Sequence, residues 1–344
     1  MYKGEIADMF TYAIIGFGGI ARMHLSNLDK IMKERGDFCL KAICGTTREK
    51  FCESTKINLG TVDVSSIDIT NCNFYDDYKE LIDKEKPDFV FSVLPTYLHE
   101  EVAVYALSRG IHVFSEKPMA LTLEGCQNMM ETAKKNNAKL MIGHSQRFKP
   151  AFLKLKEFVD NGTYGKPYRA EFFRYSATPK WSWNNWLLDP KLSGGCIFDL
   201  HIHDVDLINW LFGKPDSLNS MITNRKIEQE SVCTKYIYGD DLTVVANADW
   251  SLPQEFPFKA HCMINFDDAV VIIENDRMMI YTDEGNESIE FFDNDCFMEQ
   301  ERAFISWVID DVSCDIISCE SIYDSVYLVT KELESAASKK SIDL

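Results

Sequence analysis

The stretch "YAIIGFGGIARMHL", residues 12–25, decides the fold because an apolar strand runs through spaced glycines into a helical pattern. Gly16, Gly18 and Ala21 form the arrangement G-x-G-x-x-A. The first glycine permits a tight turn, the second lets the backbone approach a pyrophosphate, and the small third residue lets strand and helix pack closely. The helix N–H groups would then hold the phosphate. We therefore expect a dinucleotide-binding turn, rather than a glycine turn without a ligand, formed by Gly16, Phe17, Gly18, Gly19 and Ile20.

Strand-like and helix-like segments alternate from residue 10 to about 146. The strand-like runs are almost wholly apolar, as in "FCLKAICG", "DFVFSVLP", "IHVFSE" and "KLMIGHS". Such runs between helices predict a doubly wound parallel sheet that is covered on both faces. After Pro150 the spacing and turn residues of runs such as "LTVVANADW" and "FKAHCMINF" predict a largely antiparallel sheet. The predicted class is α/β, with a nucleotide-binding domain over 1–146 and a second α/β domain over 147–344.

The composition indicates an ordinary globular protein with a strongly acidic surface. At 344 residues the chain suits two domains of roughly 150 residues each. A net charge of −18 repels nucleic acids and anionic membranes, so neither is an expected partner. The eleven cysteines include no C-x-x-C pair, which is typical of reduced thiols in the cytoplasm. The start "MYKGEIADMF" is unlike a secretory signal, and no apolar run is long enough to span a membrane.

The end of the predicted second strand bears on the choice of cofactor. A site for NAD normally places an acid there to hold the adenosine ribose, but this chain has Gly45, Thr46, Thr47 and Arg48 instead. These groups could accept a 2′-phosphate, which modestly favours NADP over NAD. The alternative is that Arg48 only begins the next helix on its solvent side.

A second polar cluster lies in "LSGGCIFDLHIHDVDLINWLFGKP", residues 192–215. Apolar residues recur every three or four positions and Gly213 ends the pattern, so a helix is favoured over a strand. Asp199 and His203 are then neighbours at i,i+4, where the carboxylate can orient the imidazole for proton transfer. The alternative is a capping or buried structural pair. We expect His201, on another face, to be structural, and the residue spacing predicts no metal site.

Five motifs in this order resemble the glucose-fructose oxidoreductase / inositol dehydrogenase (Gfo/Idh/MocA) family over nearly the whole chain. They are "GFGGIA", "LPTYLHEEVAVYAL", "HVFSEKPMA", "GHSQRFKPA" and "GGCIFDLHIHDVD". The resemblance implies a Rossmann domain followed by an α/β domain with a large open-faced sheet. It also implies an NAD(P) cofactor and a sugar or cyclic polyol as the substrate.

Carried over residue by residue, the resemblance implies a catalytic trio of Lys117, Asp199 and His203, which also contacts the substrate. It further implies that the cofactor is contacted by Leu94, Pro95, Thr96, His99, Glu116 and Lys117. Arg147 is expected to reach the cofactor or the substrate. Two departures stand out: Gly45 replaces the acid of many NAD-using members, and His201 stands where a glycine is common.

The segment "TPKWSWNNWLLDP" carries Trp181, Trp183 and Trp186, which suit either a wall against a sugar ring or ordinary packing. We expect Trp186 to contact the substrate. A homodimer or homotetramer is also expected, because helices can cover only one face of the second sheet and "LTVVANADW" carries alternate apolar side chains.

The leading hypothesis is an NAD(P)-dependent oxidoreductase that acts on CH–OH groups. One alternative is a non-catalytic regulator that senses the dinucleotide on the same fold. Another is an enzyme that recycles bound NAD within one turnover, as in glycoside hydrolysis or epimerisation.

Overall fold

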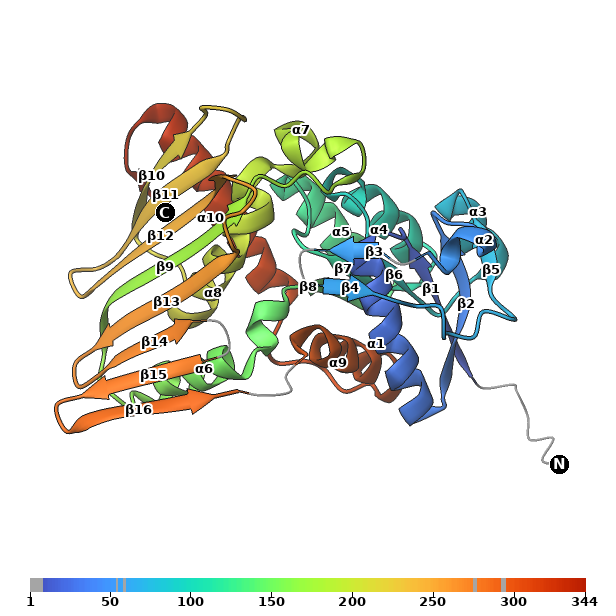
Figure 1. Cartoon of the computed structure of the whole chain (residues 1–344), viewed down its shortest axis with the longest axis horizontal. Helices are drawn as coiled ribbons and strands as arrows, with labels where there is room; N and C mark the ends of the chain where they lie inside the picture. The colour runs from blue at the N-terminus through green and yellow to red at the C-terminus, as the bar shows by residue number, and fades with distance from the viewer. Residues whose placement is uncertain (1–8, 54, 58–59, 275–276, 292–294) are drawn as a thin grey trace. The chain divides into compact units, whose positions relative to one another are not determined.

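The computed structural model describes residues 9–53, 55–57, 60–274, 277–291 and 295–344, which form two compact units (Figure 1). The first unit contains Met1–Ala120, Glu124–Gly143 and Phe297–Cys319, and the second contains Leu121–Leu123, His144–Cys296 and Glu320–Leu344. The chain therefore leaves the first unit close to the boundary predicted at residue 146, but it returns to that unit with 297–319. Residues 1–8, on which the expectation about a secretory signal rests, lie outside the described residues.

The first unit is built on a parallel sheet of six strands in the order β5-β2-β1-β6-β7-β8. These strands are β1 (Phe10–Ile15), β2 (Phe38–Cys44), β5 (Asn73–Tyr75), β6 (Phe89–Ser92), β7 (His112–Glu116) and β8 (Leu140–Gly143). Two further strands, β3 (Thr55–Ile57) and β4 (Gly60–Val62), form a separate antiparallel pair. The strand order reverses at β1, and the carboxyl ends beside such a reversal are where doubly wound sheets bind ligands.

Helices cover both faces of this sheet, which explains why its strands are almost wholly apolar (Figure 1). One face carries α1 (Gly19–Arg35) and α9 (Cys296–Asp310), and the other carries α4 (His99–Leu107) and α5 (Leu123–Lys135). The shorter helices are α2 (Arg48–Phe51) and α3 (Tyr78–Glu85). Every residue of β6 and β8 is buried. The predicted doubly wound domain is confirmed.

The membership of α9 in the first unit has a clear packing cause. The Phe304 ring lies 5.5 to 5.9 Å from the rings of Phe89, Phe91 and Phe114 on the sheet. Phe304 is completely buried, so α9 supplies core side chains to a sheet formed almost 200 residues earlier in the chain. The predicted division placed this segment in the second domain, over 147–344, and the structure corrects that assignment.

The second unit contains a sheet of nine strands in the order β16-β15-β14-β13-β9-β12-β11-β10-β17. Among the described residues its pairs are antiparallel except for β9 with β12. The strands are β9 (Pro167–Ala177), β10 (Ser217–Thr223), β11 (Ser231–Tyr238), β12 (Leu242–Leu252), β13 (Lys259–Phe266), β14 (Val270–Glu274), β15 (Arg277–Thr282), β16 (Gly285–Glu290) and β17 (Ile342–Asp343). The mostly antiparallel sheet is therefore confirmed.

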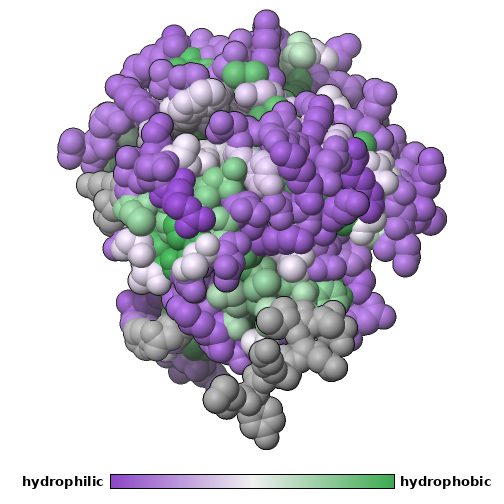
Figure 2. All heavy atoms as spheres, turned by 90° about the vertical axis from the view of Figure 1, so that its right-hand side faces the viewer, coloured by the Kyte–Doolittle hydropathy of each residue, from purple (hydrophilic) through white to green (hydrophobic). Residues whose placement is uncertain are grey.

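Three helices lie against one face of this sheet: α6 (Pro150–Asn161), α8 (Ile202–Phe212) and α10 (Cys319–Ser338) (Figure 1). The shorter elements are α7 (Pro190–Ser193), the 3₁₀ turns η2 (Thr96–Leu98), η3 (Ser145–Phe148) and η4 (Trp183–Leu188), and the π-helical turn η5 (Ile197–His201). No described helix has the length and apolar character that a membrane span needs. The visible face in Figure 2 is largely hydrophilic, in keeping with the acidic composition.

The open face of the second sheet differs from the expectation for "LTVVANADW". The apolar residues Leu242, Val244 and Trp250 are buried on the helix side, so they do not face water. The other face instead carries half-buried residues of neighbouring strands, including Phe173 and His261, whose rings stack with centroids 4.8 Å apart.

Candidate functional site

The turn after β1 requires glycine for steric reasons. Gly16 has φ +95°, and a Cβ atom there would lie 2.1 Å from the carbonyl oxygen of Val93. At Gly18, which precedes the first turn of α1, a Cβ would meet nothing within 4 Å. The backbone at Gly18 is thus open to a ligand, and Gly18 has no side chain to cap the helix N–H groups. This geometry suits a pyrophosphate at the start of α1.

A cavity of about 450 Å³ opens beside the carboxyl ends of β2 and β5. It is lined by Thr46, Thr47, Arg48, Glu49, Cys72, Asn73, Phe74, Tyr75 and Asp76. This is the place where a doubly wound domain holds the adenosine ribose of a dinucleotide. Gly45, at φ +94°, lies against the glycine turn, because a Cβ there would be 3.6 Å from the Gly16 Cα. That close approach and positive φ give a physical reason why no acidic side chain stands at position 45.

Arg48 is held by the loop that precedes β5. Its guanidinium donates hydrogen bonds to the carbonyl oxygens of Ile69 at 2.8 Å and Cys72 at 2.6 Å. It also lies over the Phe74 ring, 5.1 Å from the centroid. Arg48 therefore stabilises the wall of the cavity, and two acids, Glu49 and Asp76, line the same space.

His99 connects two segments that the family resemblance places beside the cofactor. Its ring nitrogens lie 2.7 Å from the Pro118 carbonyl oxygen and 2.9 Å from that of Leu94. Burial lowers the pKa of His99, although both carbonyls favour its charged form. Since carbonyls only accept, a neutral ring donates to one of them at a time. His99 thus fixes the chain after Lys117 against the 94–99 segment, where Thr96 is also buried.

Glu116 and Lys117 stand at the carboxyl end of β7, in the centre of the β6–β7–β8 group. The Lys117 backbone N–H donates to Glu116 Oε2 at 3.2 Å, and its side chain is half-buried. Glu116 Oε1 lies 2.8 Å from Nε2 of His24, a buried residue of α1. Burial raises the pKa of Glu116, but the hydrogen bond and the charge of His24, together with the charge of Lys117, outweigh that effect, so the pKa is lowered.

The segment that carries Asp199 and His203 is helical, as its periodicity predicts, but its first turn is a π-turn. The Ile202 N–H bonds to the Ile197 carbonyl oxygen, a spacing of five residues. Such single π-turns occur mostly within α-helices and often at functional sites. Asp199 and His203 are half-buried. Their apolar neighbours are buried, namely Phe198, Leu200 and Ile202. Asp199 and His203 are thus partly exposed polar side chains of this segment, whereas His201 between them is fully buried.

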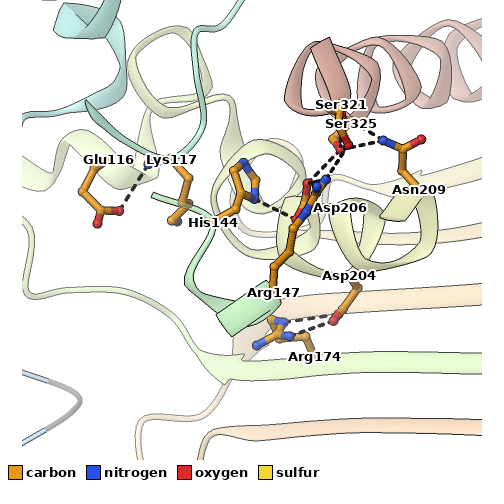
Figure 3. A network of polar contacts seen from close by, with 10 residues as sticks. All are labelled: Glu116, Lys117, His144, Arg147, Arg174, Asp204, Asp206, Asn209, Ser321 and Ser325. Carbon is orange, nitrogen blue, oxygen red and sulfur yellow. Dashed lines mark hydrogen bonds and ion pairs between the residues drawn. The ribbon is translucent and has the colours of Figure 1, made fainter. Parts of the chain in front are cut away.

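Figure 3 shows that Arg147 belongs to a buried polar network within the second unit. Its Nε and Nη2 donate to the two carboxylate oxygens of Asp206 at 2.8 and 2.7 Å, and Arg147 is only 1% exposed. His144 Nδ1 is 3.3 Å from Asp206, and Ser325 donates to the same carboxylate at 2.9 Å. Burial would raise the pKa of Asp206, but Arg147 and His144 outweigh it and hold the pKa well below its usual range. These contacts support a positioning role for Arg147.

A second buried pair lies nearby in the same unit. Arg174 of β9 donates to both oxygens of Asp204, at 3.2 and 2.7 Å, so β9 and α8 are joined by two charge-assisted hydrogen bonds (Figure 3). Asp204 and Asp206 of the "HDVD" motif are thus structural, while His203 beside them is half-buried.

His201 has the structural setting that was expected from its position on another face. It is 0% exposed, and its Nε2 lies 3.1 Å from Glu332 of α10. Tyr236 of β11 donates a hydrogen bond to the same carboxylate. A buried His–Glu–Tyr group therefore joins the π-turn to α10 and the sheet.

The aromatic segment before α7 is mostly exposed. Trp183 is 73% and Trp181 52% exposed, while Trp186 is half-buried. Asn184 and Asn185 between them have φ near +50°, a conformation that asparagine tolerates. Trp186 stays the predicted substrate contact of this group.

The expected site residues are divided between the units. The glycine turn, Thr46, Thr47, Arg48, Leu94, Pro95, Thr96, His99, Glu116 and Lys117 belong to the first unit, and Arg147, Trp186, Asp199 and His203 belong to the second. Sequence reasoning missed the buried partners His24, Glu301, His144, Asp206 and Glu332, because isolated acids and histidines carry no signal of their contacts. In the described part of the chain, no three His, Cys, Asp or Glu side chains are grouped to hold a metal ion.

Comparison with known proteins gives two family matches. Residues 10–144 match the model described as "Oxidoreductase family, NAD-binding Rossmann fold", and residues 152–291 match the "GFO/IDH/MocA C-terminal domain". A myo-inositol 2-dehydrogenase from Thermotoga maritima is 33% identical over 202 residues, which is 58% of this chain and 54% of that protein. A 2,7-anhydro-N-acetylneuraminate hydratase from Mediterraneibacter gnavus is 27% identical over 206 residues, 59% of this chain and 49% of that protein. The matches thus span about half the length of these curated relatives.

Solved structures share the whole fold at lower identity. A levoglucosan dehydrogenase in complex with NADH and L-sorbose has a TM-score of 0.83 at 16% identity, with 98% of this chain and 99% of that chain covered. A myo-inositol 2-dehydrogenase from Lactobacillus plantarum has a TM-score of 0.78 at 21% identity, with the same coverage. At these identities the likeness establishes the fold of both domains.

Proposed function

Because the chain belongs to the Gfo/Idh/MocA family of oxidoreductases, we propose that it is an NAD(P)-dependent dehydrogenase acting on a CH–OH group of a sugar or cyclic polyol. The observation that carries this proposal is the glycine turn. Only glycine fits 2.1 Å from the Val93 carbonyl at position 16, and the open backbone at Gly18 leads directly into α1. The named relatives act on polyols or sugar derivatives, which supports the substrate class.

The residues of the first unit fit a dinucleotide. Gly16 to Ile20 would hold the pyrophosphate, and the cavity beside β2 and β5 would hold the adenosine ribose. Leu94 to His99 and Glu116 to Lys117 stand at the carboxyl ends of β6 and β7, where the nicotinamide half would lie. When bound, the cofactor supplies the hydride acceptor or donor.

The chain's own side chains would manage charge and protons. Hydride leaves a secondary alcohol carbon only if the hydroxyl proton leaves too, so a base is needed. In this proposal the imidazole of His203 takes that proton and Asp199 orients the ring. The Lys117 ammonium stabilises the negative charge that develops on the substrate oxygen. In the reverse direction His203 returns the proton to the oxygen.

Both NADP(H) and NAD(H) fit the proposed cofactor site. The absence of an acid after β2 modestly favours NADP(H), as the sequence predicts. Two contacts oppose a strong preference: Arg48 already donates to two carbonyl oxygens, and Glu49 and Asp76 would repel a 2′-phosphate. We therefore propose that the site accepts both, with a modest preference for NADP(H).

The experiment that tests the activity is a substrate screen. Purified protein is incubated with each cofactor and a panel of sugars, inositols and their phosphates, while nicotinamide absorbance is followed. We expect turnover with at least one member of the panel. Cofactor binding with no turnover on any substrate class would instead favour the non-catalytic regulator.

A second candidate is an enzyme that recycles bound cofactor within one turnover. It is favoured by the 27% identical hydratase, whose named activity is not a net oxidation. Such an enzyme converts its substrate with no net change in nicotinamide absorbance. Chromatography of the reaction mixtures in the same screen separates the two candidates.

An oligomer and a cytoplasmic location complete the proposal. The open face of the second sheet presents Phe173, His261 and Met263, and none of the described helices covers it, which suits a homodimer or homotetramer (Figure 1). The sequence has eleven cysteines and no C-x-x-C pair, a pattern typical of reduced thiols, which supports the cytoplasm.

A further inference from the structure

A buried charged cluster in the first unit consists of His24, Glu116 and Glu301, hereafter the His24 cluster. His24 Nε2 lies 2.8 Å from Glu116 Oε1, and His24 Nδ1 lies 2.6 Å from Glu301 Oε1. His24 and Glu301 are 0% exposed and Glu116 is 8% exposed. The three residues come from α1, β7 and α9, so the cluster is a built feature of the tertiary structure.

The surroundings of the cluster are apolar. The rings of Phe91, Phe114 and Phe297 lie 5.4 to 6.0 Å from the His24 ring. Taking charged groups out of water in this way costs several kcal/mol per ion unless they are paired and hydrogen-bonded. The hydrogen bonds between the imidazole and the carboxylates meet this requirement for His24.

The proton count fixes the charge of the cluster. A carboxylate only accepts, so each hydrogen bond between His24 and a glutamate contains one proton. Two bonding protons shared by one imidazole and two carboxylates leave a net charge of −1, wherever each proton resides. Burial lowers the pKa of His24, but the hydrogen bonds to Glu116 and Glu301 raise it to about 10. The same net charge therefore holds at neutral pH.

The position of the cluster places this charge close to where the nicotinamide half lies in the proposed function. Glu116 ends β7 and receives the Lys117 backbone N–H on its other oxygen. In a doubly wound domain the adenosine half lies toward β2 and the pyrophosphate at the start of α1, so the nicotinamide half extends over β6 and β7. Glu116 is thus the member of the cluster nearest to the nicotinamide half in the proposed function.

We infer that the His24 cluster is a redox-selective element, which favours the oxidised cofactor over the reduced one. This inference rests on the proposed function. The oxidised nicotinamide ring carries a positive charge that the reduced ring lacks, so a fixed charge of −1 stabilises the oxidised form alone. The positive charge of Lys117 opposes this effect, but Lys117 is present in every protein compared below. Burial lowers the pKa of the nearby His99, which favours its neutral form.

The test compares dissociation constants of NAD⁺, NADH, NADP⁺ and NADPH by calorimetry in four proteins. The decisive variant is Glu301→Gln, which keeps the shape and an acceptor for His24 but removes one negative charge. We expect the ratio of oxidised to reduced dissociation constants to rise on the order of fivefold. Glu301→Asp keeps the charge and should keep the wild-type ratio even if both affinities fall.

Glu299→Gln is the matched control, because Glu299 lies on the same helix but is exposed and pairs with Arg302 at 3.6 Å. It should leave the ratio unchanged. Thermal melting of each variant confirms folding, and if Glu301→Gln does not fold, Glu116→Gln removes the same charge and should raise the ratio likewise. A purely structural role changes both affinities together and leaves their ratio constant.

The inference is wrong if the ratio of oxidised to reduced dissociation constants is unchanged in the folded charge-removing variant. It is also wrong if the ratio rises equally in Glu299→Gln or Glu301→Asp. Either result would leave the proposed function standing. If wild-type protein binds none of the four dinucleotides, the proposed function fails and the inference fails with it.

Discussion

Lys117 and His203 have separate roles in the proposed reaction, and substitutions at each should show it. We expect Lys117→Met and His203→Ala each to lower kcat by about 10² to 10⁴, because a positioned acid–base or charge-stabilising group typically contributes that much. Cofactor dissociation constants should change little, since in the proposed function the pyrophosphate is held elsewhere, at Gly16 to Ile20. The measurement is kcat beside calorimetric Kd once a substrate is found. Near-normal turnover in both variants would show that these residues are structural.

Gly16 and Gly18 are a matched pair of glycines with different constraints. Gly16→Ala places a Cβ 2.1 Å from a backbone oxygen at a positive φ, so we expect it to destabilise the fold by about 3 kcal/mol or more. Gly18→Ala meets nothing in the protein and should fold, but it should weaken dinucleotide binding by filling the space of the pyrophosphate. Denaturant unfolding and calorimetry distinguish these effects. Equal stability losses in the two variants would contradict the assignment.

At the scale of elements, the Asp206 network joins the segment after β8 to α8 and α10. Asp206→Asn leaves Arg147 buried beside a neutral amide, and we expect a stability loss of about 3 to 5 kcal/mol at neutral pH. The folded pKa of Asp206 is depressed, so its contribution is present above the ordinary aspartate pKa of about 3.9 and is lost as pH falls below it.

The measurement for Asp206 is the free energy of unfolding between neutral and acidic pH. The difference between wild type and Asp206→Asn should be largest at neutral pH and should narrow in acid. Asp240→Asn, at an exposed turn, is the control and should show no such dependence. A pH-independent difference would mean that lost packing, and not the charge, causes the effect.

The residues that line the cavity beside β2 and β5 predict the cofactor preference. Because Arg48 already bonds two carbonyl oxygens and acids line the same space, we expect the dissociation constants of NADP(H) and NAD(H) to differ by no more than about tenfold, with NADP(H) the tighter. Titration of both cofactors measures this directly. A clear preference for NAD(H) would contradict the inference from Gly45 to Arg48.

Local patterns predicted the elements well, and contacts between distant elements explain what was missed. The strand–glycine–helix run from β1 into α1 and the apolar period of α8 are properties of neighbouring residues, so they could be read directly. Glu301 lies 277 residues from His24, and nothing in either sequence context indicates that they meet. The π-turn at Ile197 was likewise invisible, because it shifts the register by one residue without changing the apolar pattern.

At the scale of the whole molecule, the open sheet face predicts self-association. We expect light scattering at micromolar concentration to give a mass of at least twice the 39.5 kDa of one chain. His261→Glu places a charge beside Phe173 on that face and should shift the protein toward monomer. Lys180→Glu, at an exposed position outside the strands, is the control. A wild-type protein of 39.5 kDa would contradict the prediction.

The return of α9 to the first unit has a consequence for synthesis of the protein on the ribosome. Domains usually fold as they emerge, from the amino terminus onward. Here the sheet that contains Phe89, Phe91 and Phe114 is translated long before Phe304, which packs against it. His24 is likewise translated long before its hydrogen-bond partner Glu301. In a fragment that ends at residue 146, the sheet face that Phe304 covers would be exposed, and His24 would lack its hydrogen bond to Glu301. The core of the first unit is therefore completed only after nearly all of the second unit has been made.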